Sequence, residues 1–200
     1  MKRFLYCLLL LVSIFCLGCG GASSDSSTEA TPKAAAFADK PAMKASAGKT
    51  IVVYFSHTKH TEAVAKKIQQ ETKADIYEIV PEKPYPKEYT PATEVAKQEQ
   101  QENARPAIKG ELPNLTEYDT IILGYPIWWY NTPMIVNTFL ESYDFTGKTI
   151  APFSTSGGAG IEGSVGTIRE LARGAVVTDG LLANDANDII PWLKEQKLIP

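Results

Sequence analysis

Short apolar runs alternate with longer segments of mixed polarity from residue 50 to the end of the chain. Apolar runs bounded by turn residues are typical of buried strands, and they predict strands at 51–55, 75–80, 120–124, 149–153 and 175–179. The longer segments between them predict helices, at 61–72, 91–103, 133–143, 162–173 and 187–197. Pro133 stands in the first turn of the third predicted helix, a position that proline favours.

The alternation of strands and helices predicts the fold class. Parallel strands need crossover connections, which helices supply, and a sheet built in this way is covered on both faces. Because such crossovers are right-handed, the sheet is doubly wound. We therefore predict an α/β protein with a doubly wound, five-stranded parallel sheet. A ligand of such a sheet binds outside the carboxyl ends of the strands, where the strand order reverses.

The first 19 residues have the pattern of a secretion signal. Lys2 and Arg3 supply positive charge, and residues 4–17 form an almost unbroken apolar stretch. That stretch is shorter than the about 20 residues of a membrane-spanning helix and is typical of a signal peptide. It is followed by Gly18-Cys19, which resembles the end of a bacterial lipoprotein signal. The resemblance implies that Cys19 is lipidated, and that the domain is anchored to the bacterial cell envelope outside the cytoplasm.

Residues 20–49 differ in composition from the rest of the chain. They are mostly Ala, Ser, Lys, Thr and Pro with little apolar periodicity, which is typical of a flexible tether. A tether of this length typically spans about 30 Å, enough to hold a small domain clear of a membrane surface. We therefore predict a signal peptide at 1–19, a tether at 20–49 and one folded domain at 50–200.

The charge and the cysteine content of the predicted domain narrow its function. Residues 50–200 contain 14 Lys and Arg against 20 Asp and Glu. This acidic balance disfavours nucleic acid as a partner and fits solubility or a cationic partner. No cysteine follows Cys19, which excludes disulfides, thiolate catalysis and cysteine-ligated metals from the domain.

The first predicted strand runs into a loop rich in hydroxyl groups, which leads into the first helix. A loop in this position presents free backbone N–H groups and the positive end of the helix dipole, and its hydroxyls add neutral donors. Such a loop suits a phosphate group. The alternative is that Ser and Thr only cap the helix. The candidate residues of this loop are Ser56, His57, Thr58, Lys59, His60 and Thr61.

Two further loops follow the third and fourth predicted strands. One has three consecutive aromatic residues that suit stacking on a flat ring, although a hydrophobic plug over the sheet is an alternative. The other is small and hydroxyl-rich, so its backbone can approach a flat ligand, although an ordinary flexible turn is an alternative. Together the three loops predict a site for a phosphorylated aromatic cofactor. Their candidate residues are Pro126, Ile127, Trp128, Trp129, Tyr130, Ser154, Thr155, Ser156, Gly157, Gly158 and Gly160.

Residues 50–200 resemble the flavodoxin family, in particular its bacterial flavodoxin-like group with paired tryptophans. The phosphate loop of the family has the pattern hydroxyl-x-hydroxyl-Gly-x-Thr. Ser56, Thr58 and Thr61 match this pattern, and Lys59 stands in place of the glycine. The resemblance extends over essentially the whole predicted domain.

The other matching motifs follow in the order of the family. Trp128-Trp129 match the loop that flanks the flavin, residues 154–160 match the third loop, and Arg105-Pro106 is also similar to this group. The resemblance implies that the cofactor is FMN and that the strand order is 2-1-3-4-5, with FMN where the order reverses. It also implies electron transfer to a redox partner protein or a membrane quinone.

The second loop departs from the family in one respect. Many flavodoxins have a glycine beside the flavin, whose peptide group rotates to bond the one-electron-reduced ring. No glycine lies between Pro126 and Pro133 in this chain. The resemblance therefore does not imply that the one-electron state is stabilised.

Motifs of other protein classes are missing or incomplete. The P-loop sequence G-x-x-x-x-G-K-[ST] is absent, and a receiver domain would need acidic residues where Ser56 and His57 stand. Glu162 stands two positions before Ser164, where a hydrolase G-x-S-x-G motif needs glycine. His57 and His60 are the only histidines, and a metal ion would have to recruit carboxylates beside them. We predict no metal site.

Two alternative functions remain beside electron transfer. An FMN-dependent reductase of quinones or nitro compounds would use NAD(P)H, but the chain has no separate G-x-G-x-x-G dinucleotide motif. An envelope lipoprotein that kept the fold and lost the cofactor would instead bind a partner. The sequence favours an FMN-binding electron carrier tethered to the membrane over a substrate-specific oxidoreductase.

Overall fold

The computed structural model describes residues 48–200. The predicted signal peptide and the predicted lipidation of Cys19 lie outside the described residues, as does the predicted tether apart from Gly48 and Lys49. Lys49 already belongs to the first strand, so the fold begins one residue earlier than predicted. Within residues 48–200 no helix is long and apolar enough to cross a membrane.

The centre of the domain is a parallel sheet. Its strands are β1 (Lys49–Tyr54), β2 (Asp75–Glu78), β3 (Tyr118–Pro126), β4 (Thr149–Thr155), β5 (Val176–Val177) and β6 (Leu181–Leu182). They lie in the order β2-β1-β3-β4-β5, and β6 also pairs with β4. All these pairings are parallel. The chain order reverses between β1 and β3, which confirms the predicted doubly wound α/β fold and its strand order.

The fifth strand, predicted to begin at 175–179, consists of two short pieces. Both β5 and β6 pair with β4 there, with Val176 beside Thr149 and Leu181 beside Phe153. The step from Val176 to Leu181 is one residue longer than the step from Thr149 to Phe153. An extra residue in one strand forms a bulge that interrupts the ladder, so the predicted fifth strand is present but is divided into β5 and β6.

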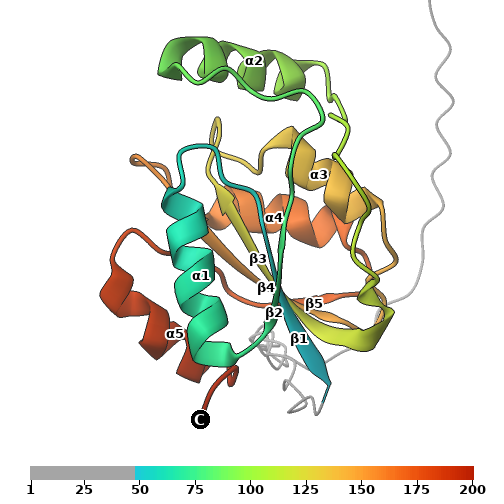
Figure 1. Ribbon diagram of the computed structural model, residues 1–200, viewed down its shortest axis with the longest axis vertical. Coiled ribbons are helices and arrows are strands. Elements are labelled where there is room, and N and C mark those ends of the chain that lie inside the picture. Colours follow the sequence, from blue (N-terminus) through green and yellow to red (C-terminus); the bar gives the residue numbers. More distant parts are fainter. Residues whose placement is uncertain (1–47) are drawn as a thin grey trace, which may run out of the picture. The chain divides into compact units, whose positions relative to one another are not determined.

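Helices cover both faces of the sheet, as Figure 1 shows. α1 (His60–Thr72) and α5 (Ile189–Glu195) lie on one face. α3 (Met134–Glu141) and α4 (Glu162–Leu171) lie on the other. This arrangement is the one predicted from the alternation of strands and helices, because right-handed crossovers place successive helices on opposite faces when the chain order reverses.

The core has two halves, one on each face of the sheet. Val52 and Ile122 pack in the half beneath α1 and α5, whereas Val53 and Leu123 pack in the half beneath α3 and α4. Sequence neighbours point to opposite faces because side chains alternate along a strand. All four side chains are fully buried. Burial on both faces explains why these strands contain several apolar residues in succession.

Each predicted helix differs from the observed one by one or two residues at one or both ends, as α1, α3, α4 and α5 illustrate. α2 (Tyr89–Gln101) begins two residues before the predicted helix. The predicted last helix divides into a 3-10 turn at Ala186–Asp188 and α5. Pro133 precedes α3 as its N-cap and does not occupy the first helical turn. Helix ends depend on local capping contacts, which an apolar pattern does not specify.

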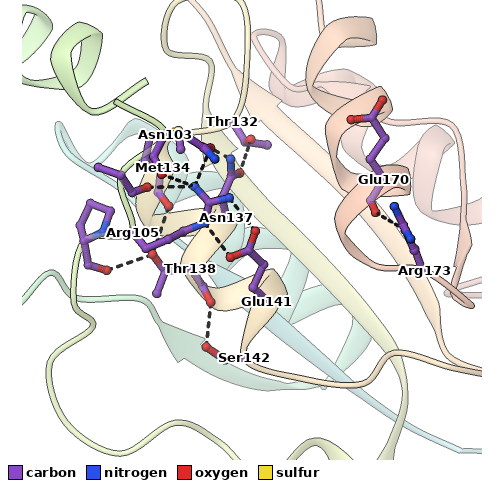
Figure 2. Close-up of polar contacts among 12 residues, drawn as sticks. Asn103, Arg105, Thr132, Met134, Asn137, Thr138, Glu141, Ser142, Glu170 and Arg173 are labelled. Carbon is purple, nitrogen blue, oxygen red and sulfur yellow. Dashed lines mark hydrogen bonds and ion pairs between the residues drawn. The ribbon is translucent and has the colours of Figure 1, made fainter. Parts of the chain in front are cut away.

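α2 belongs to neither helical layer and lies beyond the carboxyl ends of the strands (Figure 1). The segment that follows it is bound to α3 by Arg105 (Figure 2). The Nε and Nη2 groups of Arg105 each donate to Glu141 at 2.6 Å, and Nη1 donates to the backbone oxygen of Asn103 at 2.9 Å. Thr138 of α3 donates to the carbonyl of Pro106 at 3.0 Å. Bidentate Arg–carboxylate pairs fix geometry, so the end of α2 is held in place.

Candidate functional site

A cavity of about 1040 Å³ opens at the carboxyl ends of β1, β3 and β4. Its volume is at the upper end of the range for sites that hold one small ligand. The predicted site residues that line it are His57, Thr58, His60, Pro126, Ile127, Trp128, Trp129, Tyr130, Thr155, Ser156, Gly157 and Gly158. The predicted site residues that do not line it are Ser56, Lys59, Thr61, Ser154 and Gly160.

The lining of the cavity contains no carboxylate, although the domain as a whole is acidic. The basic groups that line it are Lys87, His57 and His60. A concave wall with basic groups and without acidic ones attracts anions, because low-dielectric walls focus the field. The cavity therefore suits an anionic ligand.

The loop between β1 and α1 has the geometry of an anion site. Lys59 has a φ of +68°, a left-handed conformation that glycine adopts most easily, which agrees with a glycine at this place in the family pattern. α1 begins at His60, so the N–H groups of His60 and Thr61 have no acceptor within the helix. Thr58 is exposed at the cavity, and its hydroxyl lies 3.0 Å from Nδ1 of His60.

Two hydroxyls of this loop have structural partners. Ser56 Oγ accepts a hydrogen bond from the N–H of Glu62 at 3.2 Å, which is the helix-capping alternative considered for this loop. Thr61 is buried, and its hydroxyl lies 2.8 Å from the hydroxyl of Thr155 at the end of β4. The Thr61–Thr155 contact joins the first predicted loop to the third.

The aromatic loop after β3 is a tight hairpin. The N–H of Trp128 donates to the oxygen of Asn131 at 3.0 Å, and the N–H of Asn131 donates to the oxygen of Trp128 at 3.0 Å. The two residues between them, Trp129 and Tyr130, have φ angles of +47° and +63°. Positive φ at both central positions is the signature of a type I′ turn, which usually has Asn or Gly there. Two aromatic residues in this conformation are a strained arrangement of the kind that clusters at ligand sites.

Trp128 is the centre of an aromatic cluster at the base of the cavity. Its ring centroid lies 4.9 Å from that of Tyr85, 5.4 Å from that of Phe55 and 5.7 Å from that of His57, all in edge-to-face geometry. His57 Nε2–H in turn donates to the carbonyl of Pro86 at 2.7 Å. These contacts fix Trp128 against β1 and against the segment that precedes α2.

Trp129 is instead attached to α2 and is 41% exposed. Its indole N–H donates to the carbonyl of Thr93 at 2.9 Å, and the ammonium of Lys97 lies 5.0 Å from its ring centroid. Gln100 donates to the backbone oxygen of Trp129 at 3.3 Å. Tyr130 lines the cavity beside it and is 75% exposed.

The loop after β4 is held by Asn184, which follows β6. Asn184 accepts from the N–H of Ser156 at 3.0 Å and donates to its carbonyl at 2.9 Å. Ser156 Oγ accepts from the N–H groups of Gly158 and Ala159. A Cβ added at Gly157 would meet no atom within 4 Å, so the space beside this residue is open where it lines the cavity.

Ser154 lies apart from the cavity. It is fully buried, and its hydroxyl has no hydrogen-bond partner. β4 continues to Thr155, two residues beyond the predicted end of this strand, and side chains alternate along a strand. Thr155 lines the cavity, so Ser154 points to the opposite face of the sheet.

Residues of α2 and its N-terminal flank form a wall of the cavity that the sequence did not predict. The residues concerned are Lys87, Tyr89, Ala92, Thr93 and Ala96. Asn184 was also missed. The signal for α2 was limited to the helical spacing of Tyr89, Ala92, Thr93 and Ala96 along one face, and no sequence motif marked Asn184.

The cavity wall is supported by a partly buried acid on α2. The Tyr85 hydroxyl donates to Glu99 Oε2 at 2.8 Å. Burial raises the pKa of the Glu99 carboxyl, and the hydrogen bond from Tyr85 opposes this effect in part. Burial also raises the pKa of Tyr85, with the nearby charge of Glu99 as a second cause. The phenol therefore stays protonated, and Glu99 is less acidic than an exposed glutamate.

Glu99→Gln should increase the free energy of unfolding at neutral pH and reduce its dependence on pH. A carboxyl with a pKa raised by folding stabilises the fold below its unfolded pKa, and this contribution is lost as pH rises through the folded pKa. Glutamine still accepts from Tyr85 but has no charge to desolvate. Urea unfolding from about pH 4 to about pH 8 measures the effect. Glu94→Gln, at an exposed position of α2, is the control, and equal pH dependence in wild type and Glu99→Gln would contradict the prediction.

Fold and cavity together define a class of protein: a doubly wound α/β domain with a ligand site where the strand order reverses. The sequence matches the flavodoxin family model over residues 49–196. The chain belongs to the flavodoxin family. No curated protein is significantly similar to it in sequence.

Solved structures agree with this family. A Bacteroides eggerthii protein inferred to be a flavoprotein is 35% identical, with a TM-score of 0.65 over 74% of this chain and 97% of that one. A Bacteroides uniformis protein of the same description is 36% identical, with a TM-score of 0.65 over 74% of this chain and 98% of that one. A Lactobacillus acidophilus flavoprotein in complex with FMN is 26% identical, with a TM-score of 0.61 over 73% of this chain and 99% of that one.

Proposed function

We propose that this protein binds FMN in the cavity at the carboxyl ends of the strands and works as an electron carrier. The observation that supports this most is the cavity itself. It lies between the N-terminus of α1 and the aromatic hairpin, and its lining contains no carboxylate. FMN is the ligand at the same point of the flavodoxin fold, and the L. acidophilus relative is a complex with FMN.

The residues present fit the two ends of FMN. The N–H groups at the start of α1 and the Thr58 hydroxyl would hold the phosphate, and His60 would add a donor beside it. The hairpin aromatics would lie along the ring system on one side, and the open space beside Gly157 would admit the ring on another. Bound FMN would supply the redox chemistry, and the protein would orient it and exclude water.

The proposed partner is a redox protein or a membrane quinone. Three aromatic residues at the cavity are exposed: Tyr89 to 82%, Tyr130 to 75% and Trp129 to 41%. Exposed aromatic side chains on the rim of a site favour contact with a second molecule. A carrier needs such access, because electrons must leave the cofactor at an encounter surface.

We further propose that the domain is lipid-anchored through Cys19 at the bacterial cell envelope. The support is the sequence alone: a positive start, an apolar stretch and Gly18-Cys19, followed by a segment typical of a tether. In a bacterial host that processes lipoproteins, the full-length chain should fractionate with membranes. Cys19→Ser should abolish the lipidated form detected by mass spectrometry, and a lipid-modified Cys19→Ser protein would contradict the anchor.

A further inference from the structure

Lys97 lies behind a wall of the cofactor cavity. Its ammonium is 5.0 Å from the ring centroid of Trp129, in the geometry of a cation–π contact. Trp129 lines the cavity, whereas Lys97 does not. The indole therefore brings the charge of Lys97 next to the cavity lining without making Lys97 part of it.

The position of this indole is fixed from two directions. The indole N–H of Trp129 donates to the carbonyl of Thr93 on α2. The side-chain amide of Gln100, also on α2, donates to the backbone oxygen of Trp129. The hairpin holds its backbone at a φ of +47°. Lys97 lies between Thr93 and Gln100 in the sequence of α2, at a spacing that places all three on one side of the helix. The indole that the Lys97 ammonium contacts is thus held at a defined place in the cavity wall.

We propose that Lys97 raises the reduction potential of bound FMN from behind Trp129. The proposal rests on the proposed binding of FMN in this cavity. It assigns α2 an electrostatic role in the redox function, in addition to its role as a wall.

The direction of the expected change in reduction potential follows from the charge of the reduced ring. Oxidised FMN takes up two electrons from a reductant such as dithionite and one proton from solvent, which leaves one additional negative charge on the ring. A fixed cation nearby stabilises that charge more than the neutral oxidised ring. The cavity lining has no carboxylate to cancel the effect. Because Lys97 is exposed, salt should weaken the interaction.

The test is a spectroscopic reductive titration of the full-length chain, purified in mild detergent and loaded with FMN. Lys97→Met keeps the length of the side chain and removes its charge. It should weaken the binding of reduced FMN relative to oxidised FMN by about tenfold at low salt, a fall in midpoint potential of about 30 mV for a two-electron couple. Lys97→Arg keeps the cation and should keep the potential. Lys194→Met, at an exposed position of α5, controls for net charge.

The possible results separate this proposal from the proposed function. A lower potential for Lys97→Met alone, with a difference from wild type that shrinks as salt increases, supports the role of Lys97. An unchanged potential with FMN bound overturns that role and leaves FMN binding intact. Equal shifts in Lys97→Met and Lys97→Arg overturn it in favour of a packing effect, and an equal shift in Lys194→Met overturns it in favour of net charge. If the wild-type chain binds no FMN, both proposals fall.

Discussion

Thr58→Asp should weaken the binding of FMN by about a hundredfold and leave the binding of riboflavin almost unchanged. Thr58 is exposed at the cavity beside His60, next to the free N–H groups that begin α1. A carboxylate there would face the doubly charged phosphate of FMN. Like charges a few ångströms apart near a protein surface repel by about 2–4 kcal/mol. Riboflavin has no phosphate and therefore lacks this repulsion.

Thr58→Asn is the matched control for this prediction. Asparagine has the shape of aspartate but no charge and still offers donors, so the loss of FMN affinity should stay below about tenfold. Isothermal titration of each variant with FMN and with riboflavin measures the two effects. Equal affinities of Thr58→Asp and wild type for FMN would show that the phosphate does not lie at this loop.

Trp128→Ala should produce the largest loss of stability among the hairpin substitutions, about 2–4 kcal/mol. Trp128 packs edge-to-face against Tyr85, Phe55 and His57, and its removal leaves a void between β1 and the segment before α2. The same change should weaken FMN binding, because the base of the cavity collapses. Denaturant unfolding of the apoprotein measures the first effect.

Trp129→Ala is the comparison that separates packing from stacking. Trp129 is more exposed than Trp128 and its indole contacts α2, so its removal should cost less stability than that of Trp128. It should still weaken FMN, since aromatic pairs contribute about 0.5–1.5 kcal/mol beyond area burial. Flavin fluorescence should be strongly quenched in the wild-type complex. Bright flavin in that complex, with no loss of affinity in either variant, would mean that the hairpin does not stack on the ring.

The fold was predictable because burial on both faces makes the central strands apolar over several consecutive positions. Val52 and Val53 point to opposite halves of the core and are both fully buried, and such runs stand out from their polar surroundings. The bulge between Val176 and Leu181 has no comparable signal. A bulge depends on how a strand meets its neighbour, and local sequence does not record that.

The site residues that were predictable from the sequence are those in loops at the carboxyl ends of strands. Thr58 and Trp128 lie in the loops that follow β1 and β3, and the rule for parallel sheets places such loops together. Ser154 was placed differently because β4 runs two residues further than its apolar run indicates. The wall formed by Ala92 and Ala96 was missed because α2 approaches the site through the contacts of Trp129 and Tyr85, which join distant parts of the sequence.

The conformation of the aromatic hairpin could not be predicted from the turn preferences of its residues. Turn chemistry predicts glycine or asparagine at positive φ, yet Trp129 and Tyr130 occupy these positions. The surrounding contacts on α2 and the pairing of Trp128 with Asn131 impose that conformation. Sequence reasoning from local preferences cannot find a turn that tertiary contacts enforce.

The measurement that tests the account most directly is a pair of titrations of the full-length apoprotein, one with FMN and one with riboflavin. Calorimetry gives the affinity for each flavin, and flavin fluorescence gives the quenching. The phosphate loop adds several charge-assisted hydrogen bonds, each worth about 1.5–3 kcal/mol. The account therefore predicts that FMN binds at least about a hundredfold more tightly than riboflavin, with strong quenching. Equal binding of the two flavins, or no binding of either, would contradict it.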